Sequence, residues 1–297
     1  MEHSYLLSCE STVDMPYSYV SGRGLSILFY TYIVGDKEYV DDMERDPESL
    51  NRFFAMLDQG ALPKTSQVNT FRYLEYFEKL LQQGKDILHI AFGSGMTPSV
   101  ENALAAAEQL KEKYPDRKLV VLDSTCSSSG YGLIVDQAAD LWDAGEALDA
   151  VANWVLENRE YVHHQFFSTD MKFFRRSGRV SGVAAAAASI LGICPLMRLN
   201  LAGRIIAYDK VRGKKNAIRA TVETMKARAK NGTAYDGKCF ISNSHCPEDA
   251  EYTKNAIEEE FPSLKGKVRI FNIGTIIGSH TGPGTVALFF MGDKRTE

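Results

Sequence analysis

The first half of the chain alternates short apolar runs with stretches that carry apolar residues at helical spacing. The apolar runs are predicted to be strands at 5–8, 25–34, 86–92 and 118–123. The stretches at 46–60 and 69–84 each end at a glycine, as helices commonly do. Strands that alternate with helices form a mostly parallel sheet covered on both faces. The pattern therefore predicts an α/β fold, in which ligands bind beyond the carboxyl ends of the strands.

The pattern changes after about residue 158. A strand at 163–168, a short basic helix and an alanine-rich segment at 183–197 come first. A predicted hairpin follows, because the short connection LAG joins two strand-like runs. Helices and strands then alternate to the end. We therefore predict two α/β lobes: an N-terminal lobe at 1–158 with a mostly parallel sheet flanked by helices, and a C-terminal lobe at 159–297 with a mixed sheet.

Composition excludes several classes of protein. A formal net charge of −4 argues against nucleic-acid binding, which needs a basic surface. No apolar run approaches the ~20 residues of a membrane span, and the short N-terminal apolar stretch does not fit a signal peptide. The odd number of cysteines, without paired metal spacing, predicts free thiols in a cytoplasmic protein and no metal site. These cysteines are Cys9, Cys126, Cys194, Cys239 and Cys246.

Four polar loops are predicted beside the strands. They lie at 9–16, 63–70, 93–99 and 123–132. One such loop is usually a turn with a helix cap, but four at the same sheet edge would form one pocket lined by hydrogen-bond donors. The loop FGSGMTPS combines small residues with a helix start, which suits a negatively charged group. A well-capped turn explains it equally well. Recognised nucleotide-binding and hydrolase motifs are absent from the sequence.

Two further segments carry candidate binding residues. Glycines and a proline surround His280 in GTIIGSHTGPG, so a tight loop could present its imidazole inward. Arg179 in RRSGRVS could neutralise an anion. A triad of Ser94, His280 and Asp123 can be drawn, although nothing in their spacing requires it.

Read in order, these segments resemble one family. ESTVDMP, TSQ, GSGMTPSVENA, VLDSTCSSSGYG, FFRRSGRVSG and IIGSHTGPG together resemble the DegV family of bacterial fatty-acid-binding proteins, over nearly the whole chain. The resemblance implies a two-lobed fold related to the substrate-binding subunit of dihydroxyacetone kinases. It also implies a long-chain fatty acid buried at the lobe junction, without a cofactor. Characterised relatives present the carboxylate to a separate fatty-acid kinase, which makes an acyl phosphate for phospholipid synthesis, so the carrier itself is not the catalyst.

The resemblance also assigns residues to the ligand. Thr65 and Ser66 fall on the family's TSQ element, where the threonine contacts the carboxylate. Ser94 falls on the second serine of SSxLSGT, another carboxylate contact. His280 falls on the histidine of HTGPG, and Arg179 falls on the arginine of GGR. The predicted ligand-binding set is completed by Thr97, Ser124 and Gly282.

This sequence departs from the family pattern at four positions. Gly93, Thr97 and Pro98 replace a serine, a serine and a glycine, and Glu10 begins the usual DST. Hydroxyls remain, but proline removes a backbone donor. Two alternatives stay open. One is an enzyme, either a hydrolase or a dihydroxyacetone-kinase-like subunit that uses His280, and the other is a regulatory binder of a different amphiphile.

Overall fold

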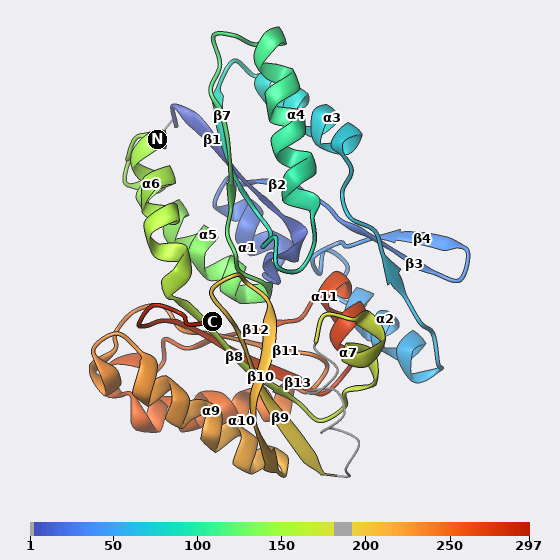
Figure 1. The fold of residues 1–297 in the computed structure, drawn as a ribbon, viewed down its shortest axis with the longest axis vertical. Helices are drawn as coiled ribbons and strands as arrows, with labels where there is room; N and C mark the ends of the chain where they lie inside the picture. The colour runs from blue at the N-terminus through green and yellow to red at the C-terminus, as the bar shows by residue number, and fades with distance from the viewer. Residues whose placement is uncertain (1–2, 181–191) are drawn as a thin grey trace.

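The computed structural model describes residues 3–180 and 192–297 (Figure 1). Most of the predicted alanine-rich segment lies outside these described residues. Strands up to Asp123 and strands from Val162 onward build separate sheets, with helices packed around them. The α/β class predicted from the sequence is confirmed.

The first sheet is parallel throughout and has the strand order β2-β1-β6-β7. Its strands are β1 (Tyr5–Glu10), β2 (Ser26–Leu28), β6 (Asp86–Ala91) and β7 (Leu119–Asp123). The helices around it are α1 (Tyr17–Gly22), α3 (Thr70–Leu81), α4 (Ser99–Lys113), α5 (Ser128–Asp143) and α6 (Leu148–Asn158). Figure 1 shows α3 and α4 on one face of this sheet and α5 and α6 on the other.

Apolar residues on both faces of the strands explain this layered arrangement. Successive side chains of a strand point to opposite faces. In β1, Leu7 packs in the cluster that contains α5 and α6, whereas Leu6 packs against the cluster that contains α3 and α4. In β6, Leu88 packs in the cluster with α5 and α6, and Ile87 packs in the cluster with α3 and α4. Continuous apolar strands of this kind are typical of parallel sheets buried on both faces.

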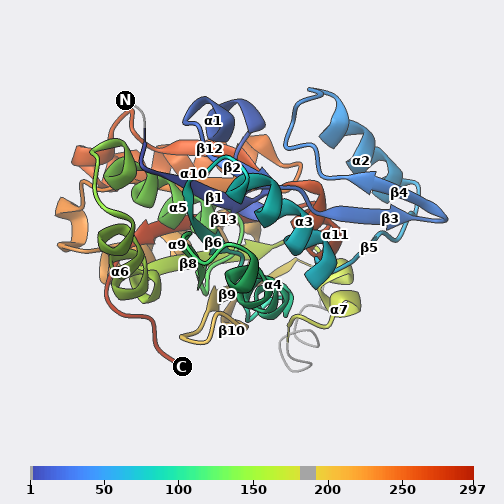
Figure 2. The same cartoon turned by 90° about the horizontal axis from the view of Figure 1, so that it is seen from above.

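The single strand predicted at 25–34 is wrong. Its first part, β2, pairs with β1 as far as Leu28, opposite Glu10, the last residue of β1. The remainder forms an antiparallel three-stranded sheet of order β4-β3-β5, which lies beside α2 (Ser49–Asp58) in Figure 2. Its strands are β3 (Thr31–Val34), β4 (Lys37–Val40) and β5 (Lys64–Thr65). The loop at 63–70 therefore belongs to this small sheet and not to the edge of the parallel one.

The second sheet has six strands in the order β10-β9-β8-β13-β11-β12. Among the strand pairs that the structure describes in this sheet, β11 and β12 are parallel and the others are antiparallel, so the predicted mixed sheet is confirmed. The strands are β8 (Val162–Ser168), β9 (Ile193–Leu199), β10 (Ile205–Arg212), β11 (Phe240–Asn243), β12 (Arg269–Asn272) and β13 (Thr285–Met291). The helices are α7 (Lys172–Ser177), α9 (Lys214–Arg228), α10 (Pro247–Glu260) and α11 (Thr275–Thr281), and α9 and α10 cover the outer face of the sheet (Figure 1).

Helix α5 lies between the two sheets and is buried along most of its length. A helix that is buried on all sides needs partners for its polar residues. Asp136 of α5 has them: its carboxylate pairs with Arg23 Nη1 at 2.5 Å and with Lys238 Nζ at 2.6 Å. Burial opposes ionisation of Asp136, but Lys238 and Arg23 hold its pKa below the usual value. This ion-pair cluster joins the first half of the chain to the loop that precedes β11.

Candidate functional site

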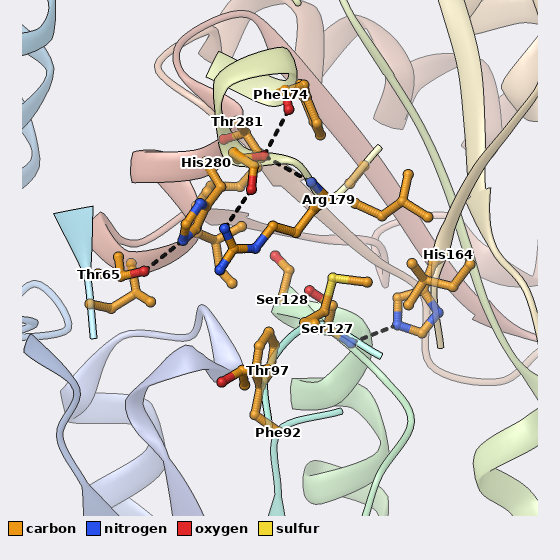
Figure 3. Close-up of a pocket in the computed structure, with 18 of the residues that line it drawn as sticks. Thr65, Phe92, Thr97, Ser127, Ser128, His164, Phe174, Arg179, His280 and Thr281 are labelled. Atoms are coloured by element: carbon orange, nitrogen blue, oxygen red, sulfur yellow. Dashed lines mark hydrogen bonds between the residues drawn. The ribbon is translucent and has the colours of Figure 1, made fainter. Parts of the chain in front are cut away.

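A cavity of about 300 Å³ lies between the two halves of the chain (Figure 3). Such a volume lies at the lower end of the range for small-molecule sites. Both halves contribute to its apolar wall, through Phe92 and Met96 on one side and residues of β8, β13 and α11 on the other. Besides Phe92 and Met96, the apolar lining residues are Pro98, Phe166, Phe174, Leu199, Ile205, Ile273, Ile276, Ile277, Ala287 and Phe289.

Polar side chains gather at one part of this cavity. Thr65 of β5 and His280 of α11 face each other, and a hydrogen bond of 2.7 Å joins Thr65 Oγ1 to His280 Nε2 (Figure 3). Arg176 of α7 connects the segments that carry these two residues, because its Nη2 donates to the carbonyl oxygens of Pro63 and Ser279 at 3.0 and 3.1 Å. The structure thus brings together two of the residues predicted for head-group binding.

The imidazole of His280 is neutral at physiological pH. Burial is the main cause that lowers its pKa to about 4, and the positive charges of Arg179 and Arg176 lower it further. Figure 3 shows Arg179 reaching into the space between His280 and Ser128. Arg179 is itself exposed at the rim, where its Nη1 donates to the Ser177 carbonyl at 2.5 Å. The site therefore presents a neutral hydrogen-bonded pair and a cation to a bound group.

Thr97 also lines the cavity, on the loop between β6 and α4. Its Oγ1 lies 3.0 Å from the hydroxyl of Ser99, which accepts a hydrogen bond from the Val68 backbone at 3.2 Å. Val68 follows the Thr65-Ser66-Gln67 segment, and all three of those residues line the cavity. Two distant loops are thereby fixed to each other, with their polar side chains at one cavity wall.

Ser94 lies outside the cavity lining, contrary to the predicted carboxylate contact. Its side chain is exposed, and its Oγ donates to Asp123 Oδ2 at 2.5 Å. The neighbouring glycines explain the loop sequence. A Cβ on Gly95 would lie 2.3 Å from the carbonyl oxygen of Gly203, and one on Gly93 would lie 2.6 Å from that of Cys126. Part of this loop thus provides close backbone packing, and of the two residues predicted there for ligand binding, Thr97 lines the cavity and Ser94 does not.

Ser124 and Gly282 also lie outside the cavity lining. Ser124 is fully buried, and its Oγ accepts a hydrogen bond of 3.2 Å from the Cys126 backbone. Gly282 has a φ of +63°, and a Cβ there would lie 2.2 Å from Phe173. Gly282 is therefore required by its backbone conformation and by close packing, while the adjacent Thr281 lines the cavity.

The glycine-rich segment around His280 forms a helix where the sequence predicted a tight loop. Helix α11 spans Thr275–Thr281 and ends at Gly282. Its residues Ile276, Ile277, His280 and Thr281 all line the cavity. The helix consequently positions both apolar wall and polar head-group residues.

Three further residues line the cavity that were not predicted from the sequence: Ser127, Ser128 and His164. Both serines lie in the polar loop at 123–132, so that loop was identified without these side chains. His164 lies on β8, a position at which a sequence pattern carries little information. Its Nε2 accepts from the Ser127 backbone at 3.1 Å, which leaves Nδ1 to donate to the Val162 carbonyl at 3.1 Å. Because burial keeps the pKa of His164 well below 6.5, its ring stays neutral.

The start of α11 lies against Asp41, a buried carboxylate whose pKa burial raises to about 6. A raised pKa means that the folded protein binds this proton more tightly than the unfolded chain does. Protonation of Asp41 therefore stabilises the fold fully below the unfolded pKa of about 4, and this stabilisation disappears as the pH rises through 6. We expect the unfolding free energy of the wild type, relative to Asp41→Asn, to fall by on the order of 3 kcal/mol between pH 4 and pH 7.5. Urea titrations at several pH values measure this, and a constant difference would contradict it.

Within residues 3–180 and 192–297, no helix has the length and apolar character needed to span a membrane. Nor do these ranges hold a group of three or more His, Cys, Asp or Glu side chains arranged to bind a metal ion. The five cysteines are free thiols.

Comparison with known proteins identifies the family. A model of the DegV family, which is described as uncharacterised, matches residues 7–293. A DegV domain-containing protein of Clostridium perfringens is 35% identical over 293 residues, which cover 98% of each chain. Among solved structures, a fatty-acid-binding DegV family protein of Thermus thermophilus has a TM-score of 0.84 at 22% identity, covering 97% of this chain and 99% of its own. The Streptococcus pneumoniae fatty acid kinase B3 protein, loaded with linoleic acid, has a TM-score of 0.81 at 18% identity, covering 98% and 100%. The chain therefore belongs to the DegV family.

Proposed function

We propose that this protein binds a long-chain fatty acid, with the acyl tail in the cavity and the carboxylate at its polar end. The observation that carries the proposal is the Thr65–His280 pair at the polar end of an otherwise largely apolar cavity. Thr97 and Arg179 lie at the same cavity and complete the proposed head-group site, with Ser66 beside them. The Thermus thermophilus relative, which is described as binding fatty acid, and the Streptococcus pneumoniae relative, which was solved with linoleic acid, support this assignment.

The energetics favour a ligand of this kind. An acyl tail of about 14 methylene groups gains roughly 11 kcal/mol when it is buried, at about 0.8 kcal/mol per group. Loss of ligand freedom offsets several kcal/mol of this gain. A hydrogen bond to a charged carboxylate adds about 1.5–3 kcal/mol. The tail therefore supplies most of the affinity, and the hydroxyls and His280 fix the orientation of the head group.

The second part of the proposal concerns the fate of the ligand. We infer that the protein is a cytoplasmic carrier without catalytic activity of its own, and that a separate fatty-acid kinase phosphorylates the carboxylate it presents. The name of the Streptococcus pneumoniae relative supports a kinase partner. The exposure of Ser66 and Arg179 supports it too, because a partner could reach the head-group end. The acyl phosphate would then enter phospholipid synthesis.

The enzyme alternative depends on the same His280. A hydroxyl activated by a histidine needs a third group that orients the imidazole. Among residues 3–180 and 192–297, no hydrogen bond to Nδ1 of His280 is found, so the Thr65–His280 pair fits ligand binding better.

Organic extraction of the purified protein and mass spectrometry test the proposal. We expect about one long-chain fatty acid per protein, and no acyl phosphate from protein and ATP until a bacterial fatty-acid kinase is added. Preparations that hold no lipid and fail to bind added palmitate would exclude a fatty-acid carrier. Turnover of an ester or of a small carbonyl compound without a partner would favour the enzyme, and a different extracted lipid would favour a binder of another amphiphile.

The protonation of His280 reports the chemistry of the bound head group. A carboxylate beside the imidazole stabilises its charged form, so palmitate is expected to raise the His280 pKa from about 4. Hexadecanol, which has the same tail and no charge, should leave that pKa below 5. NMR titration of the imidazole nitrogens measures both values. Equal pKa values with the two ligands would place the carboxylate away from His280.

A further inference from the structure

Helix α11 supplies four cavity residues, but it has only seven residues in total. Helices this short are unstable alone and depend on contacts with the rest of the protein. Its N-cap residue is Gly274, which has no side chain to satisfy the first backbone N–H groups. The position of His280 in the cavity therefore depends on what holds the start of α11.

Two carboxylates from the first half of the chain hold the start of this helix. The backbone N–H of Gly274 donates to Asp14 Oδ1 at 2.9 Å, and the Thr275 hydroxyl donates to Asp41 Oδ1 at 3.0 Å. Asp14 is 5% exposed and Asp41 is 2% exposed. Hydrogen bonds to buried carboxylates are strong because water does not compete for them.

Asp14 also contacts the opposite wall of the cavity. Its second carboxylate oxygen accepts a hydrogen bond from Ser128, the first residue of α5 and a cavity residue. Its backbone carbonyl accepts another from Ser129 at 2.7 Å. One residue thus connects α5 to α11 across the end of the cavity.

The contact between Asp14 and Gly274 leaves no free space. A Cβ on Gly274 would lie 2.9 Å from Asp14 Oδ1 and 3.5 Å from Asp41 Oδ1. An alanine at position 274 would therefore push α11 away from Asp14 and Asp41 without changing either side chain. Gly274→Ala therefore tests the effect of the position of α11 without any change to Asp14 or Asp41.

We propose that Asp14 and Asp41 are positioning residues for the head-group site: they fix the start of α11 and thereby the place of the His280 imidazole. Neither residue lines the main cavity, so each acts through the helix. The role in ligand selection rests on the proposed fatty-acid function. The role in placing His280 does not.

The first experiment needs no ligand. The groups that set the His280 pKa are its buried surroundings, Arg179 and Arg176, and Thr65 is its hydrogen-bond partner. If α11 moves, the imidazole becomes less buried, and in Asp14→Asn we expect the pKa measured by NMR to rise by about one unit toward 6.5. Asp14 is not among the groups that set this pKa, so loss of its carboxylate alone would not raise it. A rise in Gly274→Ala as well supports the proposal, and an unchanged or lowered pKa in both variants overturns it.

Asp42→Asn is the matched control. It removes the same charge one residue from Asp41, and the Asp42 carboxylate bonds to Glu44 and Asp46 backbone groups and not to α11. The His280 pKa of this variant should equal that of the wild type. Circular dichroism confirms that each variant is folded. If Asp14→Asn does not fold, Asp41→Asn and Gly274→Ala decide the question.

The second experiment compares two ligands with the same tail. Displacement of a fluorescent fatty acid should show about tenfold weaker palmitate binding in Asp41→Asn and Gly274→Ala, equivalent to one charged hydrogen bond. Hexadecanol binding should change less than about twofold, since it makes no carboxylate contact. Equal losses for both ligands would show general damage and contradict the proposal. If the wild type binds neither ligand, the proposed function fails, and the ligand-free NMR result still decides whether α11 is held as proposed.

Discussion

Replacement of Thr65 by valine is expected to weaken palmitate binding about tenfold to a hundredfold. The variant keeps the side-chain shape but removes the hydroxyl that bonds to His280 Nε2 at 2.7 Å. The bound carboxylate would lose one donor, and the imidazole would lose the partner that orients it. A hydrogen bond to a charged group is worth about 1.5–3 kcal/mol, and every 1.4 kcal/mol changes affinity about tenfold. Displacement of a fluorescent fatty acid measures the loss.

Thr224→Val is the control, because that hydroxyl bonds to the Ala220 carbonyl on α9, away from the cavity. Thr97→Val and Ser94→Ala then distinguish the two candidate positions on the loop after β6. We expect the larger loss for Thr97→Val. A larger loss for Ser94→Ala would restore the carboxylate contact first predicted from the sequence.

The second large effect is on stability. We expect Gly95→Ala to lower the free energy of unfolding by about 3 kcal/mol, at the upper end of the range for overpacked sites. The new Cβ would lie 2.3 Å from the Gly203 carbonyl oxygen and 2.6 Å from that of Ala202. Both are backbone atoms, which cannot move away by a change of rotamer. The loop after β6 and the β9–β10 turn would have to separate. Urea denaturation followed by circular dichroism measures the change.

Gly22→Ala provides the comparison for this effect. Gly22 lies in α1, and no atom lies within 4 Å of a Cβ placed on it. Alanine lowers the entropy of the unfolded chain, so a stability unchanged or increased by up to about 1 kcal/mol is expected. If the two variants unfold at the same urea concentration, the close backbone contact at Gly95 is not needed.

The sequence predicted the elements that follow a strong local period. Strands β1, β6 and β7, helix α3 and the β9–β10 hairpin are in place because apolar spacing and turn residues determine them. The split at 28–31 could not be predicted, because the run from 25 to 34 contains no glycine or proline and is apolar or aromatic except for Ser26 and Thr31. Its first part pairs with β1, and its second part pairs with β4 and β5. Which partner a strand takes is a tertiary property.

The site was predictable only where a local sequence motif identifies its residues. Motif position placed Thr65, Thr97, Arg179 and His280 at the cavity, where the structure also has them. It did not show that Ser94 lies outside the cavity lining, because a strand–loop–helix sequence does not reveal which of several small residues faces a cavity. The anchoring of α11 by Asp14 and Asp41 joins residues more than 200 positions apart, and no local pattern contains that information.

The backbone contact between Gly95 and Gly203 has a consequence for ligand exchange. It joins the two halves of the chain without side chains that could rearrange, and the ion pairs of Asp136 join them again elsewhere. A hinge motion that parted the halves would have to break both connections. Local movement around Thr65 and Arg179 is therefore the less costly route for entry and departure of an acyl chain. Substitutions at these residues should change the rate of ligand exchange more than substitutions that change the free energy of unfolding.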